Sequence, residues 1–155
     1  MPKNQEMVKD INTLGIKILL VDDHPIFLDG MHAILDTNDD FIITGEAKNG
    51  FEAIDLVHEV HPDIVLMDVA MPKLNGIEAT RKIMQLYPDI KVLALSMYSS
   101  RRFIKDMLEA GAVGYLLKDN APEKLVTAIY RIANGDTFVN RTISNKDFGI
   151  GGLIN

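Results

Sequence analysis

Three aspartates, a serine and a lysine are the residues of this sequence whose types and spacing favour chemistry. Each lies at the end of a short apolar run: Asp22 and Asp23 after Ile16–Val21, Asp68 after Ile64–Met67, Ser96 after Lys91–Leu95 and Lys118 after Gly114–Leu117. Neighbouring carboxylates repel one another unless a cation compensates, and Mg²⁺ takes hard oxygen ligands from few carboxylates while it keeps waters or phosphate oxygens. Aspartate is also a nucleophile toward phosphoryl groups, whose oxygens a lysine and a hydroxyl can stabilise. These residues therefore predict a phosphoryl acceptor, Asp68, beside a magnesium site.

These side chains converge only if the elements between them fold in one particular way. Apolar runs, which predict strands, alternate with stretches of helical period that begin near Pro25, Gly50, Gly76, Ser99 and Ala121. Strand–helix alternation with connections of this length implies parallel strands and right-handed crossovers. We expect an α/β fold, a flavodoxin-like doubly wound parallel sheet of five strands in the order 2-1-3-4-5 with five helices. The chemistry-bearing residues would then share the carboxyl edge of the sheet, where ligands bind.

Length, composition and charge limit the class of protein. The chain has 155 residues, 47% of them hydrophobic and 25% charged, which fits one globular domain. It contains no cysteine, which excludes thiolate and disulfide chemistry. The net charge of −6 disfavours direct binding of nucleic acid by this chain. No apolar run approaches the roughly 20 residues of a membrane span and the first residues lack a signal peptide, so we expect a cytoplasmic protein with no membrane contact.

The motifs together resemble a known family. The set Asp22–Asp23, Asp68-x-x-Met71–Pro72, Ser96, Tyr115 and Lys118 is similar to the receiver domain (CheY-like) of bacterial two-component response regulators. The stretches Leu95–Tyr98 and Gly114–Asp119 resemble the NarL/FixJ subfamily in particular. The resemblance covers Gly15 to Val139. We therefore expect an N-terminal tail at 1–14, a phospho-acceptor receiver domain at 15–139, and a flexible tail or the start of a linker at 140–155.

The resemblance implies a phosphoryl acceptor and a metal site. Asp68 would accept a phosphoryl group from a phosphohistidine on a sensor histidine kinase. Mg²⁺ would be bound directly by Asp23, more loosely through water by Asp22, and also by Asp68 and the backbone carbonyl of Ala70. His24 could serve as a further metal ligand, but a loop residue that lines the acidic pocket is the preferred interpretation.

The resemblance also implies a switch. Lys118 would pair with the phosphate and Ser96 would move to hydrogen-bond it. Tyr115 would turn inward as Ser96 moves and change the surface of the fourth helix, fifth strand and fifth helix, although plain core packing of Tyr115 is nearly as good an explanation. Many receivers have a proline with a cis bond after the lysine, whereas Asp119 follows here, so a trans bond or a strained loop is expected.

The output of the switch is left open by the sequence. Relatives in the subfamily carry a helix-turn-helix domain, and residues 140–155 are too few to form one. Control of transcription through a DNA-binding domain absent from this chain is preferred, and a free-standing receiver that acts by protein contact is the alternative. A homodimer is also open, with Val126, Tyr130 and Ala133 as a candidate patch on the last helix.

An enzyme is the rival from another class. Haloacid-dehalogenase-type phosphotransferases also use an aspartyl nucleophile and Mg²⁺, but they have Asp-x-Asp after the first strand where this chain has Asp22–Asp23–His24. We therefore expect a phosphorylated switch rather than an enzyme that turns over substrate.

Overall fold

The computed structural model describes residues 15–140. The predicted tail at 1–14 and nearly all of the segment 140–155 lie outside the described residues, so these two boundaries stay predictions. The strands are β1 (Ile16–Val21), β2 (Phe41–Ala47), β3 (Ile64–Asp68), β4 (Lys91–Ser96), β5 (Gly114–Leu117) and β6 (Phe138–Val139). The helices are α2 (Pro25–Leu35), α3 (Gly50–Val60), α4 (Gly76–Leu86), α5 (Arg101–Ala110) and α6 (Ala121–Ala133), with a 3₁₀ turn, η1 (Lys118–Asn120), before α6.

The strands form one parallel sheet in the order β2-β1-β3-β4-β5-β6. This confirms the predicted order of the first five strands. The short sixth strand was not predicted, because its two residues are too few to show a period. It pairs with the end of β5 through Gly114 with Phe138 and Tyr115 with Val139.

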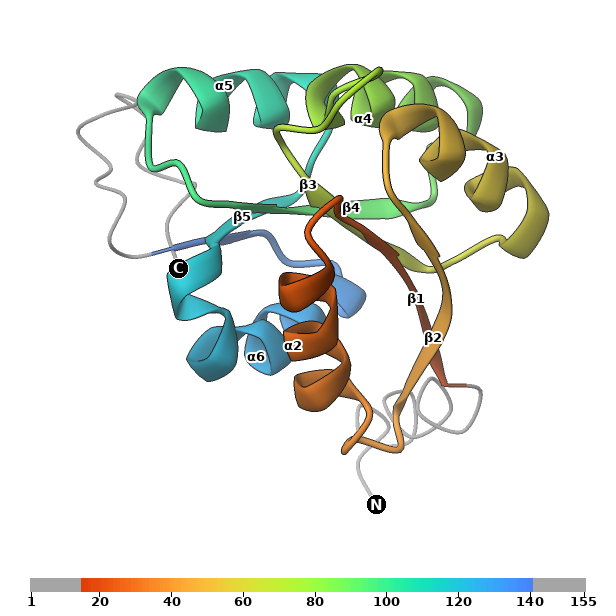
Figure 1. The fold of residues 1–155 in the computed structure, drawn as a ribbon, viewed down its shortest axis with the longest axis vertical. Coiled ribbons are helices and arrows are strands. Elements are labelled where there is room, and N and C mark those ends of the chain that lie inside the picture. The colour runs from red at the N-terminus through yellow and green to blue at the C-terminus, as the bar shows by residue number, and fades with distance from the viewer. Residues whose placement is uncertain (1–14, 141–155) are drawn as a thin grey trace.

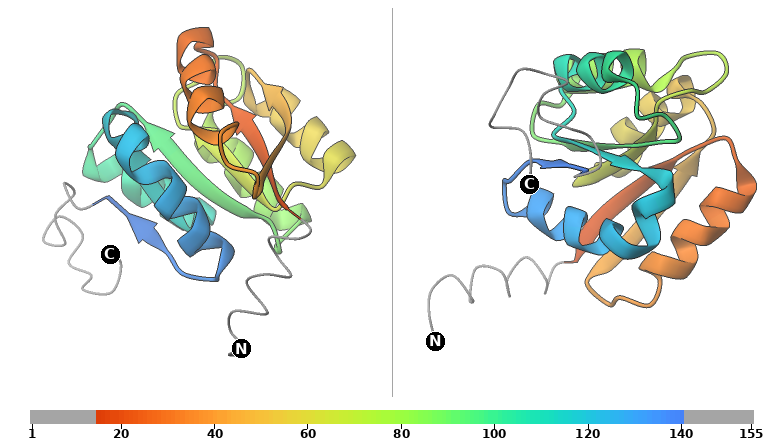
Figure 2. Two further views of the ribbon diagram at one scale, coloured as in Figure 1. Left: turned by 90° about the horizontal axis from the view of Figure 1, so that it is seen from below. Right: turned by 90° about the vertical axis from the view of Figure 1, so that its left-hand side faces the viewer.

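Helices cover both faces of the sheet (Figure 1). Helices α3, α4 and α5 lie on one face and α2 and α6 on the other, and the two side views in Figure 2 show the same three layers. Alternate residues of each central strand point to opposite faces, so Leu19 and Val65 join the core under α3–α5 while Leu20 and Leu66 join the core under α2 and α6. Burial on both faces explains why these strands are apolar throughout.

The ends of the helices follow from local side chains. Asn49 and Asn75 each cap a helix by accepting a hydrogen bond from the backbone N–H three residues later, at 3.0 Å in both cases. Pro25 lies in the first turn of α2, where its missing N–H costs nothing. Gly111 ends α5 with a φ of 115°, which favours glycine. None of the described helices is long and apolar enough to cross a membrane.

The candidate dimer patch on α6 is partly used inside the domain. Val126, Tyr130 and Ala133 are half-buried and pack against the core. The ring of Tyr130 lies 5.2 Å from that of Phe41, and its hydroxyl donates a hydrogen bond to Asp40 at 2.6 Å. Tyr130 therefore closes the domain over β2, and sequence periodicity could not reveal this partner far away in the chain.

Candidate metal and phosphoryl-acceptor site

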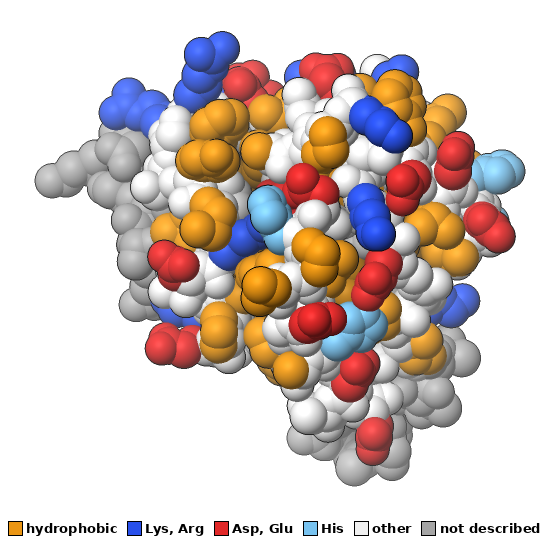
Figure 3. All heavy atoms as spheres, viewed as in Figure 1, with side chains coloured by type: hydrophobic (Ala, Val, Ile, Leu, Met, Phe, Trp, Pro, Cys, Tyr) orange, Lys and Arg blue, Asp and Glu red, His pale blue; other side chains and the backbone are white. Residues whose placement is uncertain are grey.

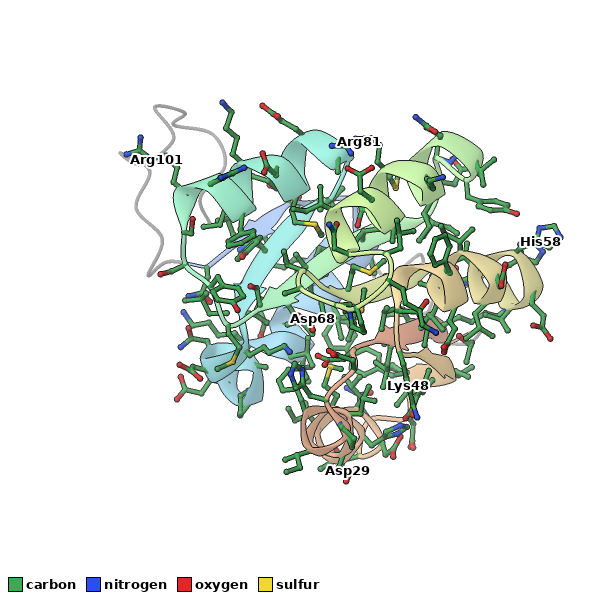
Figure 4. All side chains as sticks on the ribbon, turned by 45° about the horizontal axis from the view of Figure 1, so that its top comes forward. Asp29, Lys48, His58, Asp68, Arg81 and Arg101 are labelled. Carbon is green, nitrogen blue, oxygen red and sulfur yellow. The ribbon has the colours of Figure 1, made fainter. Side chains whose placement is uncertain are left out.

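The predicted residues converge at the carboxyl edge of the sheet. Asp22 follows β1 and its backbone N–H donates to the carbonyl of Ala47 at 3.0 Å, which extends the pairing with β2. Asp68 is the last residue of β3 and lies opposite Leu95, the residue before Ser96. Figure 4 shows Asp68 at the centre of this edge, whereas Asp29 lies on the outer side of α2. In the space-filling view acidic side chains and a histidine meet near the middle of this face, between hydrophobic side chains (Figure 3).

A buried lysine joins two of the acids. The Nζ atom of Lys118 lies 2.7 Å from Oδ2 of Asp22 and 3.5 Å from Oδ1 of Asp68. Lys118, the first residue of the turn η1, is only 6% exposed. The same ammonium lies 4.5 Å from the ring centroid of Phe27, a cation–π contact that fixes its position further. Asp22, Asp23, Asp68 and Lys118 together are called the acidic pocket below.

The negative charge of the acidic pocket is only partly neutralised. Oδ1 of Asp23 and Oδ2 of Asp68 are buried and have no hydrogen-bond partner among the described residues. Burial, and next the charge of Asp22, raise the pKa of Asp68 to about 6, although Lys118 opposes this rise. A carboxylate with a raised pKa and an unsatisfied oxygen is in a position that a cation would stabilise.

The spacing of the acids fits one bound cation. One ligand atom from each of Asp22, Asp23, His24 and Asp68 lies within 4.8 Å of the others. Ligands of a divalent ion at about 2.0–2.1 Å are separated by at most about 4.2 Å, so small side-chain rotations would bring these atoms into one coordination sphere. The donor set, rich in carboxylate oxygens, therefore fits a hard divalent cation.

The backbone of the acceptor is supported by a glycine. A Cβ atom at Gly76 would lie 2.0 Å from the carbonyl oxygen of Asp68, and the N–H of Gly76 donates to the carbonyl of Val69 at 2.9 Å. Only glycine lets the start of α4 approach the end of β3 so closely. The start of α4 therefore packs directly against the backbone of Asp68 at the end of β3.

The serine and the tyrosine predicted as switch residues both contact Tyr98. Oγ of Ser96 accepts a hydrogen bond from the N–H of Tyr98 at 2.9 Å, and the hydroxyl of Tyr115 donates to the carbonyl of Tyr98 at 2.7 Å. Tyr115 is fully buried. Burial raises the pKa of its hydroxyl to about 12, against the effect of a hydrogen bond with Ser96. Tyr115 is thus already turned inward in this structure.

Comparison with known families decides the class of the domain. Residues 18–130 match the family described as response regulator receiver domain. The chain belongs to this family.

Curated relatives of the receiver domain are transcriptional regulators of the NarL and DegU type. The chain is 37% identical over 140 residues to the transcriptional regulatory protein DegU of Brevibacillus brevis, covering 90% of this chain and 59% of DegU. It is 33% identical over 127 residues to the nitrate/nitrite response regulator protein NarL of Escherichia coli K12, covering 82% of this chain and 59% of NarL. The chain therefore spans about three fifths of the length of these relatives.

Solved structures agree with the receiver fold. A LuxR-family two-component response regulator from Aurantimonas superposes with a TM-score of 0.77 at 37% identity, covering 81% of this chain and 89% of the other. The signal receiver domain of a NarL-type regulator from Mycobacterium tuberculosis superposes with a TM-score of 0.75 at 29% identity, covering 78% and 98%. Together with the family match, these neighbours confirm the resemblance found in the sequence.

Two residues that support the candidate site are not predicted by the sequence. The spacing of Phe27 is typical of the core-facing side of a helix, and nothing in it indicates the contact with Lys118. Gly76 is predicted only as the start of a helical stretch, and the sequence does not show its close approach to the backbone of Asp68. Ala70 lies in the exposed loop after β3, and its role as a metal ligand through the backbone carbonyl stays a prediction. No described peptide bond is cis, so the bond between Lys118 and Asp119 is trans.

Proposed function

We propose that the receiver domain acts as a Mg²⁺-dependent phosphoryl acceptor, with Asp68 as the residue that is modified and a sensor histidine kinase as the donor. The observation that carries the proposal is the surroundings of the two carboxylate oxygens of Asp68. One of its oxygens faces the Lys118 ammonium, and the other is buried without a hydrogen-bond partner beside two further acids. Such a group is held rigidly at a strand end and is ready to accept a phosphoryl group and a cation together.

The proposed reaction is a single transfer. A carboxylate oxygen of Asp68 forms a bond to the phosphorus of the donor's phosphohistidine, and the phosphorus–nitrogen bond breaks with its electron pair going to the leaving imidazole. The product is an acyl phosphate on Asp68. Because the residue is modified once and not regenerated within the step, the domain works as a switch and not as an enzyme with turnover.

The surrounding side chains stabilise the product. Asp23 would bind Mg²⁺ directly, and Asp22 would act through water because Lys118 already occupies one of its oxygens. Asp68 and the backbone carbonyl of Ala70 would complete the protein ligands. When bound, Mg²⁺ supplies positive charge that offsets the acids and the transferred phosphoryl oxygens. Lys118 would follow the phosphoryl group as an ion-pair partner.

The signal would leave the site through Tyr98. If Ser96 turns to hydrogen-bond the phosphoryl group, it must release the N–H of Tyr98, whose carbonyl also holds Tyr115. The ring of Tyr98 lies 5.1 Å from that of Phe103 on α5. A movement of Tyr98, in the loop between β4 and α5, would therefore alter the surface of α5, β5 and α6. In this way a local change of charge at Asp68 would shift the balance between two conformations of that surface. We propose that this surface controls transcription through a DNA-binding output; DegU, one of the relatives, is described as a transcriptional regulatory protein.

Two aspartates at opposite ends of β3 test the assignment. Asp68→Asn should abolish labelling by acetyl phosphate in the presence of Mg²⁺, because the amide is not a nucleophile toward phosphorus. The matched control, Asp63→Asn, changes an exposed aspartate at the amino end of the same strand and should label like the wild type. Intact-protein mass spectrometry measures both. Full labelling of the Asp68→Asn variant would refute the proposal.

A further inference from the structure

His24 has a position that the proposed function does not use. It is the N-cap residue of α2, yet its side chain makes no capping hydrogen bond. Its ring faces the acidic pocket instead. Nδ1 lies 2.9 Å from Oδ1 of Asp22, 3.3 Å from Oδ1 of Asp23 and 3.8 Å from Oδ2 of Asp68. Three carboxylates thus converge on one ring nitrogen.

The separations of Nδ1 from Asp23 and Asp68 are those expected of ligands that share one metal ion, whereas the contact with Asp22 is a hydrogen bond. Two ligand atoms each about 2.1 Å from an ion lie about 3.0 Å apart at right angles and about 4.2 Å apart on opposite sides. The distances of 3.3 Å to Asp23 and 3.8 Å to Asp68 fall within this range. The backbone N–H of His24 also donates to Oδ1 of Asp22 at 2.9 Å, which fixes the backbone from which the ring projects.

A second observation points to a bound cation at this place. Two of the oxygens that face Nδ1, Oδ1 of Asp23 and Oδ2 of Asp68, are buried and have no hydrogen-bond partner. The side chain of Asp68 is 5% exposed and that of His24 is 61% exposed. Asp68 is therefore held in place, while the imidazole lies at the mouth of the pocket and can adjust its ring at little cost.

A nitrogen ligand changes which metals the pocket prefers. Mg²⁺ takes oxygen ligands and gains little from an imidazole. Imidazole is a good ligand for first-row transition metals, whose affinity for a given site rises from Mn²⁺ through Co²⁺ and Ni²⁺. A pocket of three carboxylates and one imidazole is thus a mixed oxygen and nitrogen site.

We propose that His24 is a metal ligand through Nδ1 for first-row transition-metal dications, with Co²⁺ as the representative ion, in the same pocket that binds Mg²⁺ through oxygens alone. The inference rests on the metal site of the proposed function and adds a specificity-determining residue to it. His24 would let the receiver bind Co²⁺ more tightly than its carboxylates alone could.

The test is a comparison of two metals on matched histidine variants of the untagged full chain. Co²⁺ binding is measured by visible absorbance and Mg²⁺ binding by calorimetry, for wild type, His24→Ala and His32→Ala. His32 lies in α2, the helix that follows His24, but contacts Glu46 instead of the acidic pocket. His24→Ala should weaken Co²⁺ binding roughly tenfold or more and Mg²⁺ binding less than about threefold, and His32→Ala should leave both nearly unchanged.

The outcomes separate this inference from the proposed function. A Co²⁺ loss in His24→Ala that does not exceed the Mg²⁺ loss would overturn the role of His24, while Mg²⁺ binding to the wild type would still support the metal site. If neither ion binds the wild type at the pocket, both the inference and the metal site are wrong. Asp23→Ala should weaken both ions together, because its carboxylate would bind either one.

Discussion

The two ends of the sheet differ in how they hold charge. At the amino end, a hollow of about 510 Å³ is lined by apolar residues and by Lys17, Asp63, Asp89 and Lys91. These charges are balanced, and Asp63 accepts a hydrogen bond from the N–H of Lys17 at 2.8 Å while it stays exposed. At the carboxyl end, Asp22 and Asp68 are buried beside one lysine, and carboxylate oxygens there lack partners.

This difference shows that size alone does not mark a functional site. The amino-end hollow is roomy, but its two lysines and two aspartates balance in charge, and Asp63 has a backbone hydrogen-bond donor. The carboxyl end concentrates uncompensated negative charge in a buried place, which the fold tolerates only at a cost in stability. Such a cost is typical of residues kept for function.

The largest expected difference between the two ends concerns their lysines. Lys118→Met should lower the free energy of unfolding by about 3–5 kcal/mol near neutral pH without divalent metal, because it leaves Asp22 and Asp68 buried without their partner. Lys17→Met, at an exposed position of β1, should change it by less than about 0.5 kcal/mol. Urea denaturation of both variants measures the difference. Equal effects of the two substitutions would mean that the carboxyl end is not electrostatically special.

The next largest effect is a gain in stability when the acceptor loses its charge. The pKa of Asp68 is raised from 3.8 to about 6 in the folded state, so between these values the folded protein binds more protons than the unfolded chain. Stability therefore falls as the pH rises through this window, and the deficit is complete above about pH 6.

Asp68→Asn removes this deficit. We expect the variant to be more stable than wild type by on the order of 2–3 kcal/mol at about pH 8 without divalent metal, and to match it near pH 4. Asp63→Asn should show no such pH dependence. Denaturation at several pH values measures both. A variant that is less stable than wild type at pH about 8 would show that Asp68 is stabilised and not strained by its neighbours.

The smallest effect is expected at the amino end itself. Asp63→Ala removes the acceptor for the N–H of Lys17, and because the group is exposed, water can replace it. The free energy of unfolding should fall by about 0.5–1 kcal/mol, and Mg²⁺ affinity should not change. Thermal unfolding and calorimetric titration of this variant measure these two quantities. A clear loss of Mg²⁺ affinity would mean that the metal is bound at the amino end of the sheet, which contradicts a site at the carboxyl end.

Most of the fold could be predicted because the central strands carry their own signal. Ile16–Val21 and Lys91–Ser96 are apolar runs with polar or turn residues on either side, and the structure has strands with the same bounds. The strand Phe138–Val139 could not be predicted, since its two residues form a strand only because the edge of β5 is open to them. The contact between the rings of Tyr130 and Phe41 likewise arises only when the domain is packed, so the sequence does not predict it.

The residues of the candidate site could be predicted from the sequence, but the contacts and orientations of their side chains could not. Topology alone brings Asp22, Asp68 and Lys118 to one edge, because each directly follows a central or neighbouring strand. The ion pair between Lys118 and Asp22 depends on the turn η1, which has no signal in the sequence. The inward position of Tyr115 and the approach of His24 to three carboxylates depend on side-chain packing, which spacing does not encode.

The location of a bound cation tests the central claim most directly. A crystal of the protein grown with Mn²⁺ in place of Mg²⁺ would reveal the ion by its anomalous scattering. We expect a peak between Asp22, Asp23 and Asp68, within bonding distance of Oδ1 of Asp23 and Oδ2 of Asp68, which have no hydrogen-bond partner among the described residues. A map with no peak there, or with the ion in the amino-end hollow beside Asp63 and Asp89 instead, would contradict it.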